Sequence, residues 1–138
     1  MLRLLVLCTG NSARSQMGEG LFRHEGGGAV EVVSAGTNPS HVRPEAIAAM
    51  REIGIDISQQ RSKSVNEFAG QKFDVIVTVC DNARDACPVF PGVAERVHWS
   101  FEDPAAAQGS DAERLATFRK VREQIHARVK SFYSLRQR

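Results

Sequence analysis

The chain has 138 residues, of which 42% are hydrophobic and 25% are charged, and its formal net charge is +2. This length supports one domain with one hydrophobic core, which we expect to span residues 1–138. The small net charge gives no support to nucleic-acid binding, and no segment approaches the roughly 20 apolar residues that cross a bilayer. The odd number of cysteines, three, indicates reduced thiols rather than a disulfide framework. We therefore expect a soluble, cytoplasmic protein that is a monomer.

The predicted elements alternate between strands and helices, as judged from runs of β-branched residues and from the helical spacing of apolar ones. In chain order we expect a strand over 4–8, a helix from 13 to the glycines at 26–28, a strand over 30–36, a helix over 44–54, a short helix over 64–70, a strand over 73–79, a broken helical turn and loop over 81–92, a strand over 96–99 and a long helix from 110. The last helix begins at Ser110-Asp111-Ala112-Glu113, which has the form of a capping box.

This alternation predicts an α/β fold, in which four parallel strands form one sheet and helices cover both of its faces. Ligands of such folds bind beyond the carboxyl ends of the strands. Cys8 follows the first strand, Cys80 the third and Asp103 the fourth. We therefore expect these three side chains to converge on one edge of the sheet.

The stretch after the first strand predicts an anion-binding loop. Gly10 and Asn11 tolerate positive φ, so the backbone N–H groups of a tight turn can surround an oxyanion. Arg14 adds a planar fork of donors for two of its oxygens. The same donors stabilise a thiolate at Cys8, and Ser15 can donate to the sulfur, so we expect a lowered pKa for Cys8. The expected substrate-binding residues are Thr9, Gly10, Asn11, Ser12, Ala13, Arg14 and Ser15.

Three parts of the chain resemble one known family. They are Cys-Thr-Gly-Asn-Ser-Ala-Arg-Ser at 8–15, Val-Cys-Asp-Asn at 79–82 with Cys-Pro at 87–88, and His-Trp at 98–99 with Glu-Asp-Pro at 102–104. They are similar to the thioredoxin-coupled arsenate reductases, which are built on the low-molecular-weight protein tyrosine phosphatase fold. The first part is shared with the phosphatases, whereas the paired downstream cysteines are more specific. The resemblance implies arsenate as substrate, with phosphate or sulfate as mimics, thioredoxin as electron donor, and no cofactor.

The same resemblance implies a relay of three thiols. Cys8 attacks arsenate to form a thiol-arsenate adduct, and Cys80 then attacks Cys8, so that arsenite leaves. Cys87 next attacks Cys80 and releases Cys8, which places the disulfide within reach of thioredoxin. A regular helix separates residues seven apart by roughly 10 Å, beyond disulfide reach, so we expect the segment 81–91 to rearrange between redox states.

Loss of an oxygen from arsenate needs a proton, and Asp103 is the expected general acid. Its alternative role is that of a turn residue before Pro104. Glu102 is the weaker candidate for the same proton transfer.

Other functions remain open at the level of sequence. A tyrosine phosphatase would use a Cys8 phosphoenzyme, but aromatic residues that could flank a tyrosyl ring are replaced by alanine at 105–107. An arsenite-binding protein would use the three thiols as soft ligands, and would leave Arg14 unexplained. A reductase could also draw electrons from glutathione and glutaredoxin, although that route needs no second resolving thiol such as Cys87.

We expect no metal site. The cysteines lack zinc-type spacing, and the four histidines are scattered over different elements. Some members of the resembled family bind potassium close to the loop, with an acid near the position of Lys63. A lysine there should repel or replace a cation, and its alternative role is that of a solvated surface charge.

Overall fold

The structure, a computed structural model, describes residues 1–88 and 90–136. Its strands and helices are β1 (Leu2–Cys8), α1 (Arg14–Gly26), β2 (Val30–Gly36), α2 (Pro44–Arg51), β3 (Val75–Thr78), α3 (Asp81–Ala86), β4 (Glu95–His98) and α4 (Asp111–Arg136). Three short 3-10 helices join them: η1 (Gly27–Ala29), η2 (Val65–Phe68) and η3 (Pro104–Ala106). Each strand and helix expected from the sequence is present, and only the ends differ by a few residues.

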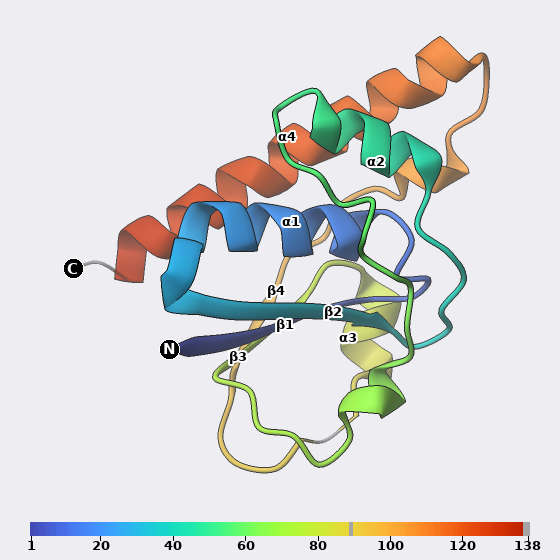
Figure 1. Cartoon of the computed structure of the whole chain (residues 1–138). Helices are drawn as coiled ribbons and strands as arrows, with labels where there is room; N and C mark the ends of the chain where they lie inside the picture. Colours follow the sequence, from blue (N-terminus) through green and yellow to red (C-terminus); the bar gives the residue numbers. More distant parts are fainter. Residues whose placement is uncertain (89, 137–138) are drawn as a thin grey trace.

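The four strands form a parallel sheet in the order β2-β1-β3-β4. Figure 1 shows α1 and α4 over one face of this sheet, with α2 packed outside them, and α3 on the other face. The predicted α/β fold, with helices on both faces, is confirmed. Because all strands run in one direction, their carboxyl ends meet at one edge, where the chain leaves β1, β2, β3 and β4 in loops.

The central position of β1 explains its composition. Leu4, Leu5, Val6 and Leu7 have no exposed surface, since helices cover both faces of this strand. A parallel strand of this kind is expected as a continuous apolar run rather than an alternating one. Burial of each such side chain contributes roughly 1.5–3 kcal/mol to folding. The first turn of the chain after β1 is thus held on a rigid base.

The long helix α4 begins with the predicted capping box. The Glu113 amide donates to Ser110 Oγ at 3.1 Å, and the Ser110 amide donates to Glu113 Oε1 at 3.2 Å. The face turned to α1 and the sheet is apolar and buried, through Phe118, Val121, Ile125, Val129 and Phe132. Within 1–88 and 90–136, no helix combines the length and the apolar character that a membrane span requires.

Candidate active site

A cavity of about 300 Å³ opens at the carboxyl end of β1. It is lined by Cys8, Thr9, Gly10, Ser12, Ala13, Arg14, Asn38, Ser40, Arg43, Asp103 and Ala105. The structure therefore brings the predicted nucleophile, the predicted arginine and the predicted acid into one cavity. Asn11 and Ser15 lie beneath this surface, where both are fully buried. A larger cavity of about 360 Å³ lies between α2 and the start of α4, and no cysteine lines it.

The loop between β1 and α1 turns at a single strained residue. Asn11 has a φ of 47°, as predicted, whereas Gly10 does not have the positive φ expected for it. The conformation of Asn11 is held by its own side chain. Its Oδ1 accepts from the Lys63 amide at 3.0 Å, and its Nδ2 donates to Ser15 Oγ at 2.7 Å and to Ser34 Oγ at 3.0 Å. These three hydrogen bonds offset the cost of the left-handed region.

Two groups can donate hydrogen bonds to the sulfur of Cys8. The Asn11 amide donates to Cys8 Sγ at 3.2 Å, and Ser15 Oγ lies 2.8 Å from the same atom. Since Asn11 Nδ2 already donates to Ser15 Oγ, the Ser15 hydroxyl is free to donate its hydrogen to the sulfur. This arrangement is the one that a thiolate requires.

Burial nevertheless raises the pKa of the Cys8 thiol above its usual value. The hydrogen bonds from Ser15 and Asn11 and the charge of Arg14 lower it only in part. The expected lowering of this pKa is therefore wrong. The sequence indicated the donors correctly, but Cys8 is 2% exposed, and loss of hydration disfavours the charged form of a thiol so deeply placed.

Arg14 begins α1 and reaches back across the cavity. Its Nη1 donates to the Phe101 carbonyl at 3.0 Å, and its Nη2 lies 3.9 Å from Asp103 Oδ2. The Asp103 carboxylate also accepts from the Ala105 amide at 3.0 Å, so it caps η3. Both roles considered for Asp103, a turn residue and an acid at the cavity, have a structural basis. Glu102 instead pairs with Lys120 at 2.7 Å and does not line the cavity.

Cys80 lies beside the loop although it does not line the cavity. Because Leu7 pairs with Thr78 across neighbouring parallel strands, the residues that follow them leave the sheet side by side. Thr9 Oγ1 is 3.4 Å from Cys80 Sγ, and the Ala83 amide donates to the same sulfur at 3.4 Å. Cys80 is thus both the neighbour of the loop and the N-cap of α3.

Cys87 lies at the opposite end of α3, as its C-cap, and is half-buried. Arg96 Nη1 donates to Cys87 Sγ at 3.1 Å. All three thiols are free. The first turn of α3 is held by His98, whose Nε2 lies 2.9 Å from Asp81 Oδ1. This hydrogen bond is the main reason for the lowered pKa of Asp81.

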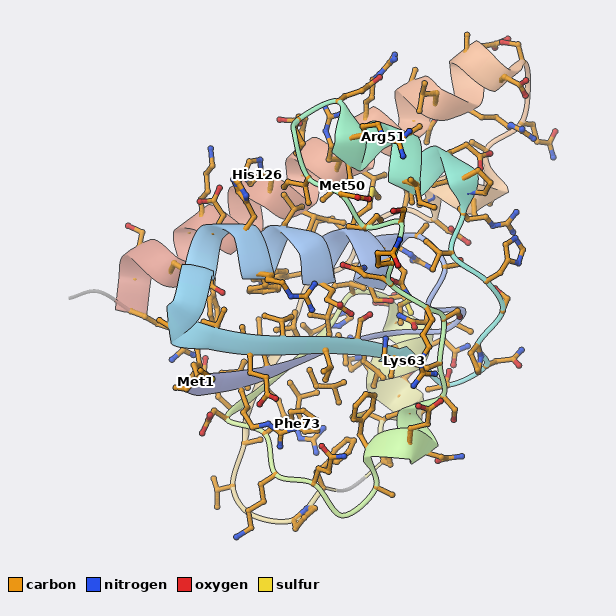
Figure 2. The ribbon with its side chains drawn as sticks, viewed as in Figure 1. Met1, Met50, Arg51, Lys63, Phe73 and His126 are labelled. Atoms are coloured by element: carbon orange, nitrogen blue, oxygen red, sulfur yellow. The ribbon has the colours of Figure 1, made fainter. Side chains whose placement is uncertain are left out.

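A network of buried polar side chains supports the loop from behind. Ser34 Oγ donates to Glu19 Oε1 at 2.7 Å, and Lys63 Nζ lies 3.7 Å from the same oxygen. Figure 2 shows Lys63 beside the carboxyl end of β2. Its side chain is only 10% exposed, and this burial lowers the pKa of its amine, so the interpretation of Lys63 as a solvated surface charge is wrong. In the described ranges, no cluster of three or more metal-ligating side chains occurs.

Three polar residues of the cavity were not predicted from the sequence: Asn38, Ser40 and Arg43. They belong to the loop after β2, which lies along the loop after β1. The amides of these three residues donate to the carbonyls of Thr9, Gly10 and Ser12, at 2.8, 3.0 and 2.9 Å. A signal was available, because neighbouring parallel strands end at the same edge and their loops must meet there.

Comparison with known proteins identifies the family. The profile of the family described as low molecular weight phosphotyrosine protein phosphatase matches residues 3–137. The chain belongs to this family. Its curated relatives include an arsenate reductase of Halalkalibacterium halodurans, which is 51% identical over 129 residues, covering 94% of this chain and 93% of the relative. An arsenate reductase of Bacillus subtilis is 45% identical over the same shares of both chains.

Solved structures of the family agree with the fold. An arsenate reductase in the phosphate binding state matches with a TM-score of 0.79 and 35% identity, covering 97% of this chain and 98% of that one. A low molecular weight protein tyrosine phosphatase from T. tengcongensis matches with a TM-score of 0.78 and 25% identity, covering 97% and 99%. The resemblance stated from the sequence, to arsenate reductases built on the phosphatase fold, is confirmed.

Proposed function

We propose that this chain reduces arsenate to arsenite through Cys8, Cys80 and Cys87, and that thioredoxin restores the reduced enzyme. One observation carries the proposal: a second thiol, Cys80, lies beside the anion loop, with its sulfur 3.4 Å from the hydroxyl of Thr9. A hydrolase that releases its product with water has no use for this thiol. The relatives named as arsenate reductases support the same choice.

The first step uses the cavity. Arsenate is a tetrahedral oxyanion, and the backbone donors of the loop together with Arg14 suit its oxygens. The sulfur of Cys8 attacks arsenic, a sulfur–arsenic bond forms, and one oxygen leaves as water after it is protonated. Asp103 lies beside Arg14 at the cavity and is the side chain proposed to supply this proton.

The second step transfers the electrons. The thiolate of Cys80 attacks the sulfur of Cys8, a disulfide forms between them, and the electron pair of the sulfur–arsenic bond passes to arsenic. Arsenic is thereby reduced from the +5 to the +3 state and leaves as arsenite. As the N-cap of α3, Cys80 accepts a hydrogen bond from the Ala83 amide, and this bond helps to hold its sulfur beside the anion loop.

The third step regenerates the free Cys8. Cys87 attacks the sulfur of Cys80, and Cys8 leaves as a thiolate. Before this step, Arg96 donates a hydrogen bond to the sulfur of Cys87. Since the two cysteines cap opposite ends of α3, the helix has to open before they can meet. A dithiol of thioredoxin then reduces the bond between Cys80 and Cys87, in keeping with a reducing, cytoplasmic compartment.

The test is arsenate-dependent oxidation of NADPH with purified thioredoxin and thioredoxin reductase. We expect no turnover for Cys8→Ser or Cys80→Ser, and about one turnover followed by arrest for Cys87→Ser, because its disulfide joins two buried sulfurs that the donor cannot reach. Sustained turnover by Cys87→Ser would mean that the donor reduces the first disulfide directly. Turnover with glutathione and glutaredoxin, but not with thioredoxin, would assign the other donor.

A phosphatase activity is the second candidate, because the fold is shared with a tyrosine phosphatase. Its test is hydrolysis of p-nitrophenyl phosphate by the wild type and by Cys80→Ser. Hydrolysis at a rate above that of arsenate reduction, unaffected by Cys80→Ser, would favour the phosphatase. We expect the opposite order, because alanine at 105 lines the cavity where an aromatic side chain would hold a tyrosyl ring.

A further inference from the structure

The cavity contains a second guanidinium for which the mechanism above has no use. Arg43 lines the cavity from the loop that leads into α2. Its amide donates to the Ser12 carbonyl at 2.9 Å, and its carbonyl accepts from the Ala46 amide at 3.0 Å. The backbone of Arg43 is therefore fixed between the anion loop and the first turn of α2. Its position relative to the cavity does not depend on a mobile surface segment.

The side chain of Arg43 is not occupied elsewhere. Most arginines that the structure describes form an ion pair with a carboxylate, and the exceptions are Arg43, Arg51, Arg96 and Arg128. Of these four, Arg43 alone lines the cavity. Its Nε is buried and has no hydrogen-bond partner within the described residues. No ion pair within the described residues holds this guanidinium away from an anion in the cavity.

The charges of the side chains that line the cavity also indicate a binding role for Arg43. Its lining contains two arginines, Arg14 and Arg43, and one acidic residue, Asp103. Arg14 and Asp103 lie 3.9 Å apart and offset each other, so Arg43 supplies the net positive charge of the lining. A cavity without Arg43 would have one positive side chain fewer to balance the charge of a dianion.

We propose that Arg43 is a second substrate-binding arginine, which contacts the oxygens of the tetrahedral dianion on the side of the α2 loop. The proposal rests on the proposed function only for the identity of the anion. Arg43 enters no bond-making step, and it binds the anion to the same extent before and during the attack by Cys8. Its loss should therefore raise KM and leave kcat nearly unchanged.

The test compares Arg43→Gln, Arg43→Lys and the matched control Arg51→Gln. Arg51 is exposed at the C-terminal end of α2, the helix that follows Arg43. It forms no ion pair in the described part of the chain and does not line the cavity. Calorimetric titration with inorganic phosphate reports anion binding without any redox step. We expect Arg43→Gln to weaken phosphate about 10-fold, as for loss of one charged hydrogen bond at a partly exposed site. Arg43→Lys should recover most of this loss, and Arg51→Gln should match the wild type.

Steady-state kinetics with arsenate supplies an independent readout. The KM of Arg43→Gln should rise about 10-fold with kcat changed less than about twofold, and its KM should depend less on ionic strength than that of the wild type. Phosphate binding by Arg43→Gln as tight as that of the wild type would overturn the proposal. Tight phosphate binding by the wild type, weakened in Arg43→Gln, with no arsenate reduction by either, would overturn the proposed function and leave the role of Arg43 intact.

Discussion

The amine of Lys63 lies 3.7 Å from the carboxylate of Glu19, and both side chains are at least 90% buried behind the anion loop. Lys63 and Glu19 lie far apart in the sequence. The backbone amide of Lys63 also donates a hydrogen bond to Asn11 in the anion loop. The amine of the lysine is thus held behind the anion loop, against a buried carboxylate. Two consequences follow, one for stability and one for ion dependence.

Replacing Lys63 by methionine should lower the free energy of unfolding by about 2 kcal/mol, because Glu19 keeps Arg23 as a partner but loses a buried one. Chemical denaturation measures this change, and Lys72→Met, at an exposed lysine without an ion pair in the described ranges, is the control. The wild type should melt at the same temperature in KCl and NaCl. A stabilisation specific to potassium would contradict the interpretation that the lysine replaces the cation.

The pH dependence of Cys8 follows from its raised pKa. Only the thiolate reacts with iodoacetamide, so the rate of alkylation should rise with pH and reach half its maximum above the value of about 8.5 found for a free cysteine. The measurement uses a variant with serine at 80 and 87, in which Cys8 is the single thiol. Ser15→Ala should move this midpoint further up, since it removes a donor to the sulfur. A midpoint below that of free cysteine would show that the loop donors outweigh burial.

Asp103→Asn should reduce kcat for arsenate about 100-fold, the order expected for loss of a general acid. The asparagine oxygen can still accept from the Ala105 amide, so the cap of η3 is retained. Phosphate affinity should not fall, because a negative charge leaves the cavity. Glu102→Gln, which loses only the surface pair with Lys120, serves as the control and should keep full activity. An unchanged kcat in Asp103→Asn would mean that Asp103 only caps η3 and does not act as the general acid.

Oxidation should open α3. After one turnover without thioredoxin, we expect the amides of 81–86 to exchange with deuterium at least tenfold faster than in the reduced enzyme, because Cys80 and Cys87 cannot meet across an intact helix. Cys80→Ser treated in the same way is the control, and should keep the protection of the reduced enzyme, because no disulfide can form at residue 80. Equal protection in the reduced and oxidised wild type would count against the relay.

Much of the site could be predicted because its signals are local. The apolar run of β1, the polar residues that follow it and the capping box at Ser110 each lie within a few residues, and alternation of strands and helices then placed Cys8, Cys80 and Asp103 at one edge. The depth of burial of Cys8 could not be predicted in this way, since it depends on helices from distant parts of the chain that cover β1.

The same limit applies to Arg43 and Lys63. Each is an ordinary charged residue in an irregular segment, and nothing in its neighbours along the chain distinguishes it from a surface charge. Arg43 lies at the cavity because the loop after β2 is hydrogen-bonded to the loop after β1. Lys63 gains its partner because η2 follows a segment that returns to the end of β2, where Gly36 meets Lys63 and Ser64. Such contacts are properties of the tertiary fold.

The N-cap of α3 couples the proposed relay to the unwinding of this helix. The sulfur of Cys80 caps the first turn of this six-residue helix by accepting from the Ala83 amide. A sulfur bonded to Cys8 is a poorer acceptor and is drawn toward the cavity, so the reaction itself removes the cap. The helix is too short to persist without outside support. Substrate turnover and the unwinding that lets Cys87 approach would then be one event, with no separate trigger.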